Sequence, residues 1–245
     1  MVKAAVMGAD QNLDWHGLAA SALEWWRDAG VDTIVEDEAF PWLDAPAPVA
    51  PVVASAPVPA TAAMPDTLPA FLTWRAGAAA PEADWGGTAI AGSGPADATL
   101  MIIVDCPERG DRTQLMEGPT GALFDRMLAA IGQSRDTVAL AAVCSRRPPT
   151  GRVPRDTEAR LGEIARHHAG LAAPKRLLAM GDAATRALLT MNATEARGRL
   201  HTLQHKSGSM TQVVATHHPR VLIERPAMKM EAWRDLLLLT GETDT

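Results

Sequence analysis

The segment GPTGALFDRMLAAIGQSRDTVALAAV, residues 118–143, carries a helix pattern followed at once by a strand pattern. Its first half places Leu123, Met127, Ala130 and Ile131 on one face of an amphipathic helix. Its second half, residues 137–143, is a short apolar run typical of a strand. Helices that alternate with strands build parallel sheets, so this segment predicts an α/β domain.

The same alternation continues on both sides of this segment. We predict strands at 100–105, 175–180 and 212–219, and helices at 67–80, 156–171, 181–189 and 226–239. The run LMIIVD at 100–105 is apolar on both faces, as expected inside a parallel sheet. The fold class predicted for residues 66–245 is therefore a three-layer α/β/α domain with a short, mostly parallel four-stranded sheet.

The region before residue 66 has a different character. Residues 14–30 predict an amphipathic helix that places Trp25 and Trp26 together, and a strand-like stretch follows at 31–37. Residues 1–43 therefore form an acidic N-terminal helix region, and the Pro/Ala-rich residues 44–65 form a linker. The two tryptophans either pack against the main domain or form a docking surface for a protein partner.

Composition excludes several classes of protein. The 245 residues carry a net charge of −6, yet residues 140–235 are predominantly basic, which fits either a polyanion partner or solvated Arg-rich helices. Two cysteines exclude a disulfide framework and a four-thiolate metal site. Prolines within 45–63 prevent a membrane-spanning helix, and the N-terminus lacks the apolar core of a signal peptide. We expect a cytoplasmic protein with no membrane partner.

Two side chains at predicted strand ends could carry chemistry. Parallel sheets bind ligands beyond the carboxyl ends of their strands, where Asp105 and His218 lie. A carboxylate can activate water, and an imidazole can donate a hydrogen bond to an anionic leaving group. The alternatives are that Asp105 caps a loop and that His218 is a core histidine. The sequence has no dinucleotide, P-loop or GxSxG motif and no metal-ligand spacing.

Taken in order, five segments resemble the uracil-DNA glycosylase superfamily, and most closely its bacterial and archaeal family-four iron–sulfur enzymes. Residues 118–143 carry the most specific resemblance. The others are LMIIVDCPERGD (100–111), RPPTGRVPRDTEA (147–159), KRLLAMGDAATRALL (175–189) and ATHHPRVLIERPAMKMEAWRDL (215–236).

The resemblance implies an enzyme of DNA base-excision repair that flips uracil out of DNA and hydrolyses its glycosidic bond. It places Asp105 on a glutamate that helps to position water, and His218 on a histidine that stabilises the leaving base. The base pocket that it implies comprises Val104, Cys106, Pro107, Met116 and Ala142. The DNA contacts that it implies come from Arg146, Arg147, Gly181, Arg220, Val221 and Leu222.

The departures from the family pattern bear on cofactor and activity. The family's cluster cysteines are missing, with Arg146 and Gly162 at two of their positions, so we expect no iron–sulfur cluster and no other cofactor. Packing would have to replace the cluster, with Trp74 or Trp85 as candidates. Met116 and Ala142 replace a stacking phenylalanine and a base-reading asparagine. Three functions therefore stay open: an active glycosylase for uracil or another damaged base, a weak or inactive DNA-binding module, and a partner-recruiting protein.

Overall fold

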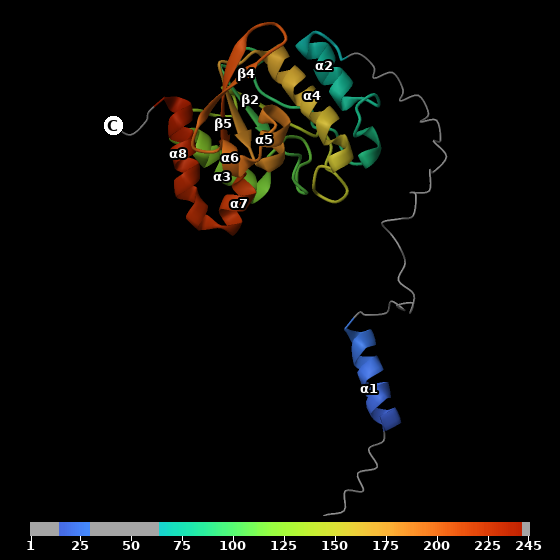
Figure 1. Ribbon diagram of the computed structural model, residues 1–245. Helices are drawn as coiled ribbons and strands as arrows, with labels where there is room; N and C mark the ends of the chain where they lie inside the picture. The colour runs from blue at the N-terminus through green and yellow to red at the C-terminus, as the bar shows by residue number, and fades with distance from the viewer. Residues whose placement is uncertain (1–14, 30–63, 242–245) are drawn as a thin grey trace, which may run out of the picture. The chain divides into compact units, whose positions relative to one another are not determined.

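The computed structural model describes residues 15–29 and 64–241, which form two separate units. The first is helix α1 (Trp15–Asp28), which confirms the predicted N-terminal helix (Figure 1). The Trp25 and Trp26 rings meet edge to face with centroids 5.2 Å apart. The strand-like stretch 31–37 lies outside the described residues, and the linker limits 44–65 stay a prediction.

The second unit is built on a five-stranded sheet. Its strands are β1 (Leu100–Val104), β2 (Val138–Ala142), β3 (Arg176–Met180), β4 (Leu200–Gln204) and β5 (Met210–Thr216), in the order β2-β1-β3-β5-β4. All neighbours are parallel except β4, which runs antiparallel to β5. The mostly parallel sheet is confirmed, with β4 as one strand more than predicted.

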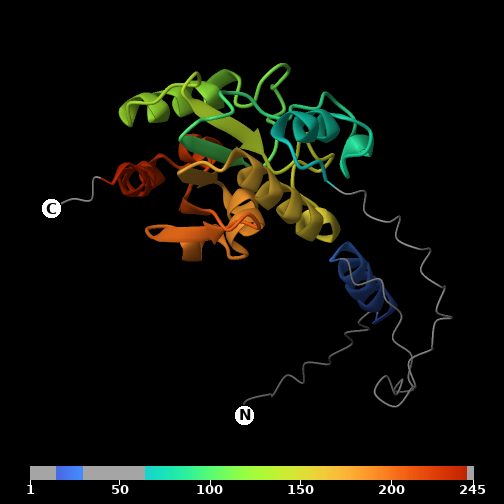
Figure 2. The ribbon, with the colours of Figure 1, turned by 90° about the horizontal axis from the view of Figure 1, so that it is seen from above.

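Helices cover both faces of this sheet, as the two views in Figures 1 and 2 show. One face carries α3 (Gly118–Ala130), α7 (Pro219–Glu224) and α8 (Lys229–Thr240). The other face carries α4 (Arg155–Ala172) and α5 (Asp182–Leu189), with α2 (Leu68–Ala76) against α4. Short helical turns lie at η1 (Ala83–Trp85), α6 (Ala193–Ala196) and η2 (Pro226–Met228). The predicted three layers are confirmed.

The core lies in two layers because successive strand side chains point to opposite faces of a sheet. Ile102 and Val104 of β1 pack on the side of α3 and α8, while Met101 and Ile103 pack on the side of α4 and α5. Every residue of β1 is buried, as the apolar run at 100–105 predicted. In the described ranges no helix has both the length and the apolar composition to cross a membrane.

The chain after β5 differs from the prediction. Residues 219–224 form the separate helix α7, where a loop was expected before one helix at 226–239. Pro219 occupies the first turn of α7, and the His218 side chain accepts a hydrogen bond from the backbone N–H of Arg220 as its N-cap. Pro226 then opens the next turn, because proline cannot continue a helix through its interior. As the N-cap of α7, His218 is held in position by the start of that helix.

Candidate active site

The carboxyl ends of three adjacent strands bring Asp105, Gly181 and His218 to one edge of the sheet. Asp105 follows β1, Gly181 follows β3, and His218 lies two residues after β5. The N–H of Gly181 donates to the Thr216 carbonyl at 3.0 Å, which ties the ends of β3 and β5 together. The Asp105 Oδ1 atom accepts a hydrogen bond of 2.8 Å from the N–H of Ala184, in the first turn of α5.

The surroundings of Asp105 raise the pKa of its carboxyl group, which makes the carboxylate a stronger base. Burial raises its pKa from 3.8 to about 6, although the Ala184 hydrogen bond and the charges of Arg220 and Arg186 lower it. The group is therefore ionised at neutral pH, yet more basic than a surface aspartate. A base with a pKa close to the working pH is suited to accept a proton from water. Asp105 does cap α5, but this leaves its second oxygen without a hydrogen bond among the described residues.

His218 is a buried, neutral hydrogen-bond donor. It is 2% exposed, and its Nδ1 accepts from the N–H of Arg220 at 3.2 Å. This bond assigns the proton of the neutral ring to Nε2, which has no hydrogen-bond partner among the described residues. Burial, and secondarily the charge of Arg220, lower the pKa to about 3, so the ring is neutral at physiological pH. A buried donor without a partner costs about 1–3 kcal/mol, which argues for a role in binding over one in the core.

The structure adds Glu108, which the sequence analysis did not single out. Its Oε1 lies 3.8 Å from Nε2 of His218. Its two carboxylate oxygens accept from Nη1 of Arg220 at 3.0 and 3.2 Å, and Arg147 approaches to 3.9 Å. Glu108 and Arg220 are 112 positions apart, so only the fold reveals the pair. In the sequence, Glu108 could have been noticed as a charged residue directly after Pro107, at the end of a predicted strand.

Three of the five predicted pocket residues share one layer of the core. Val104, Met116 and Ala142 belong to the buried cluster on the side of α3 and α8, and Val104 is the register partner of Ala142. Cys106 belongs to the cluster on the opposite face of the sheet, and Pro107 is buried with its carbonyl accepting from Arg147 at 2.8 Å. The structure therefore groups Val104, Met116 and Ala142 and places Cys106 apart from them.

Met116 has an unusual backbone conformation for its residue type. Its φ is 60°, a region that residues with side chains seldom occupy. Asp111 accepts from its N–H at 3.0 Å, and Arg135 donates to its carbonyl at 2.6 Å. The surrounding structure holds this residue in place and buries its side chain.

The three arginines to which the resemblance assigns DNA contact have different surroundings. Arg147 and Arg220 lie beside Glu108 and are partly exposed, next to the candidate active site. Arg146 donates to the backbone carbonyls of Gly87 and Ala76, so its guanidinium serves the fold.

The apolar residues to which the resemblance assigns DNA contact lie on α7. Leu222 is 1% exposed and packs in the core, so in this structure its side chain is not exposed for the DNA contact that the resemblance implies. Val221 is partly buried, whereas its neighbour Ile223 is 45% exposed. Ile223 is therefore the exposed large apolar side chain of α7.

The residues present do not fit an iron–sulfur cluster. The chain has two cysteines, Cys106 and Cys144, and both are buried as free thiols. Within residues 15–29 and 64–241 no three His, Cys, Asp or Glu side chains gather in a possible metal site. Gly162, which stands at one of the family's cysteine positions, lies close to the backbone of α5. A Cβ atom added to Gly162 would lie 3.2 Å from the carbonyl oxygen of Ala187.

A buried charged network joins residues 75–82 to the end of β2. Arg75 pairs with Glu82, both almost fully buried, and also donates to the carbonyl of Val143. Ser145 donates to Glu82 from its N–H at 2.7 Å and from its hydroxyl at 3.0 Å. Trp85 packs at the margin of the core, but buried polar contacts, and not tryptophan packing alone, hold this segment in place.

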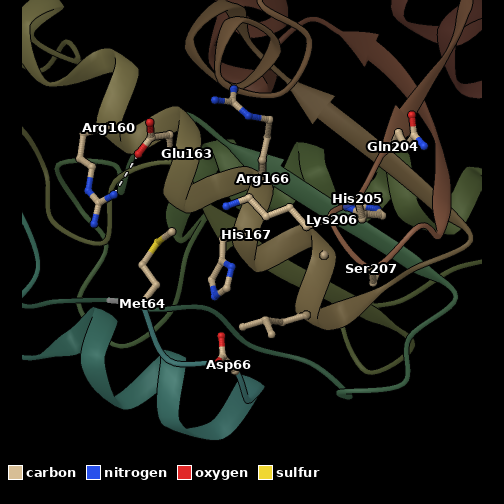
Figure 3. A pocket seen from close by; sticks show the side chains of 12 residues that line it. Met64, Asp66, Arg160, Glu163, Arg166, His167, Gln204, His205, Lys206 and Ser207 are labelled. Atoms are coloured by element: carbon tan, nitrogen blue, oxygen red, sulfur yellow. Dashed lines mark hydrogen bonds and ion pairs between the residues drawn. The ribbon is translucent and has the colours of Figure 1, made fainter. Parts of the chain in front are cut away.

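A cavity of about 600 Å³ lies away from the candidate active site (Figure 3). It lies between α4, the β4–β5 turn and residues 64–66, and it is lined by Arg160, Arg166, His167 and Lys206 among others. None of the predicted site residues lines it. The candidate active site is therefore defined by its side chains and not by the size of a cavity.

Residues 91–237 match the Uracil DNA glycosylase superfamily, and this chain belongs to that superfamily. Among its relatives, it is 26% identical over 163 residues to the type-4 uracil-DNA glycosylase of Pyrobaculum aerophilum, covering 62% of this chain and 82% of the relative. It is 23% identical over 151 residues to the type-4 uracil-DNA glycosylase of Archaeoglobus fulgidus, covering 58% and 75%. The predicted superfamily and the similarity to family four are confirmed.

Proposed function

We propose that the protein hydrolyses the N-glycosidic bond of uracil, or of another damaged base, in DNA as a step of base-excision repair. The observation that carries this proposal is the buried, neutral His218, whose Nε2–H has no partner among the described residues. It lies at the same sheet edge as the basic carboxylate of Asp105. The two type-4 glycosylases named above support uracil as the base.

The two side chains would divide the work of the reaction. A flipped-out base gives the enzyme access to the bond between C1′ and the base nitrogen. Asp105 accepts the proton of the attacking water, whose oxygen forms the new bond to C1′. The electron pair of the broken bond stays on the departing base, which leaves as an anion. The Nε2–H of His218 donates a hydrogen bond to an oxygen of that anion and lowers the barrier.

We propose that this chemistry runs without an iron–sulfur cluster in this chain. The two buried cysteines cannot supply the ligands of a four-thiolate cluster, and Arg146 is engaged with backbone carbonyls. Iron and sulfide analysis of the purified protein tests this point. Neither element should be present in stoichiometric amount, and visible charge-transfer absorbance would contradict the proposal.

The experiment for the proposed function uses oligonucleotides that carry one uracil, single- and double-stranded, followed by alkaline cleavage of abasic sites. The matched variants are His218→Ala and His217→Ala. His217 is adjacent in sequence, but its Nε2 pairs with Glu231 at 3.1 Å. Cleavage lost only in His218→Ala supports the proposal. Binding by the wild type without cleavage would favour the alternative of a catalytically inactive DNA-binding module.

Helix α1 favours recruitment of a protein partner as a second function. Its residues Leu18, Leu23, Trp25 and Trp26 are between 50% and 70% exposed. Large apolar side chains gathered on one exposed helix are typical of interaction surfaces. The variant Trp25→Ala/Trp26→Ala should excise bases from free oligonucleotides at the wild-type rate and lose binding to such a partner. A loss of excision would show instead that α1 serves the active site.

A further inference from the structure

Glu108 and His218 present an acceptor and a donor side by side. Within the part of the chain that the structure describes, the Nε2–H of His218 has no hydrogen-bond partner, and the Oε1 atom of Glu108 lies 3.8 Å from Nε2. This distance is too long for a hydrogen bond between the two groups, so neither group satisfies the other. Ala142, the pocket position at the end of β2, has no side-chain donor or acceptor of its own. The base would therefore be read by other residues.

This pair matches a base edge on which a carbonyl oxygen is next to an N–H group. Such a lactam edge occurs in uracil, where the N3–H lies between two carbonyl groups. The carbonyl oxygen would accept from Nε2 of His218, and the N–H would donate to the carboxylate of Glu108. We propose that Glu108 is the residue that selects the base, by reading the N–H of a lactam edge beside the oxygen held by His218. This inference rests on the proposed function and names its substrate class.

Neighbouring groups hold Glu108 in the position that this role requires. Arg220 donates to both carboxylate oxygens, and the Glu108 side chain is 15% exposed. The N–H of Glu108 donates to Asp111 Oδ2 at 2.8 Å, and Asp111 also fixes Met116. A carboxylate has about four lone-pair positions, so the bonds from Arg220 leave room for the base. Preorganised acceptors lose less entropy on binding than mobile ones.

The arrangement distinguishes bases by the hydrogen at their ring nitrogen. Cytosine presents an unprotonated N3 beside its carbonyl, so two lone pairs would face each other at Glu108. A methyl group on N3 of uracil removes the hydrogen and adds bulk at the same place. Both bases should bind worse than uracil, because cytosine places an acceptor against the carboxylate and N3-methyluracil loses the donor and adds bulk. Thymine shares the lactam edge, so this pair does not discriminate against it.

The test measures binding of full-length protein to single-stranded oligonucleotides by fluorescence anisotropy. The central nucleotide is a 2′-fluoro analogue, which resists hydrolysis, carrying uracil, N3-methyluracil or cytosine. The wild type should prefer uracil over each of the others by about tenfold or more. In Glu108→Ala the preference over N3-methyluracil should disappear. In Glu108→Gln the side-chain amide can donate to N3, so the preference over cytosine should fall or reverse.

The control variant is Glu224→Gln, which changes an exposed glutamate at the end of α7. It should keep the wild-type preferences, and thermal unfolding should show that all variants are folded. If the wild type does not distinguish uracil from N3-methyluracil, or if folded Glu108→Ala and Glu108→Gln keep its preferences, the inference is wrong. Because binding is measured without cleavage, a preference that depends on Glu108 would support the inference even if uracil excision proves absent.

Discussion

The carboxylate of Asp105 occupies the space that a Cβ atom on Gly181 would need, at the ends of the neighbouring strands β1 and β3. A Cβ atom added to Gly181 would lie 2.6 Å from Oδ2 and 2.7 Å from Oδ1 of Asp105. The φ of Gly181 is 103°, a conformation that favours glycine. Glycine at this position therefore permits the close approach that places the carboxylate at the first turn of α5.

We expect Gly181→Ala to abolish base excision by displacing Asp105. Gly208→Ala provides the matched control, because Gly208 also has a positive φ of 84°, but no atom of the described residues lies within 4 Å of an added Cβ. Both variants should lose roughly 1–3 kcal/mol of stability from backbone strain. Excision assays and urea unfolding separate the two effects. Excision by Gly181→Ala at the rate of Gly208→Ala would show that the position of Asp105 is not critical.

The rate of base excision should fall as the pH drops through about 6. Asp105 must be ionised to accept a proton from water, and burial raises its pKa to about 6. His218 contributes no change in this range, because its pKa is about 3 and the ring stays neutral. The measurement is kcat/KM between pH 4.5 and 8.5. A profile flat through pH 6 would contradict the role of Asp105 as the base.

Asp105→Asn should be inactive but more stable than the wild type at pH 8. The native state raises the pKa of Asp105 from 3.8 to about 6, so the native state binds the proton more tightly than the unfolded state. This contribution to stability is complete below pH 4 and is lost as the pH rises through 6. An asparagine can still accept from Ala184 without carrying charge. Urea unfolding at pH 8 should show a gain of about 1–3 kcal/mol, which shrinks toward pH 4. A loss of stability at pH 8 would contradict this account of Asp105.

Removing one partner of the buried Arg75–Glu82 pair should destabilise the domain strongly. Glu82→Leu leaves the guanidinium of Arg75 buried without its carboxylate, at a cost of about 3–5 kcal/mol. The double variant Arg75→Met/Glu82→Leu should recover part of this loss, because no unpaired charge remains, although the N–H of Ser145 and the carbonyl of Val143 still lose their partners. Urea unfolding of the three proteins measures the effect. Equal losses in the single and double variants would show that the pair is not the source of the stability.

The sequence predicts those parts of the fold in which apolar residues recur at a regular spacing. β1 and α3 follow from the run at 100–105 and from the helical spacing of Leu123 and Met127. The sequence analysis did not predict β4, because β4 is an edge strand of the sheet and its residues LHTLQ are mostly exposed or half-exposed. α7 was missed because six residues between His218 and Arg225 are too few to show a helical period.

The candidate site could be predicted only in part, for a similar reason. Asp105 and His218 each follow a strand, so their place at the sheet edge follows from the order of elements along the chain. The partnership of Glu108 with Arg220 and His218 joins residues more than one hundred positions apart, and no local pattern encodes it. The burial of Leu222 likewise depends on how α7 packs against the core.

Single-turnover excision of uracil from an oligonucleotide by the wild type, His218→Ala and His217→Ala tests the central claim most directly. The buried Nε2–H donor predicts that His218→Ala loses about 100-fold or more in rate. His217→Ala should retain the wild-type rate, because its imidazole pairs with Glu231. Folded His218→Ala that excises uracil as fast as the wild type would contradict the account, as would a wild type that binds uracil-containing DNA without cleaving it.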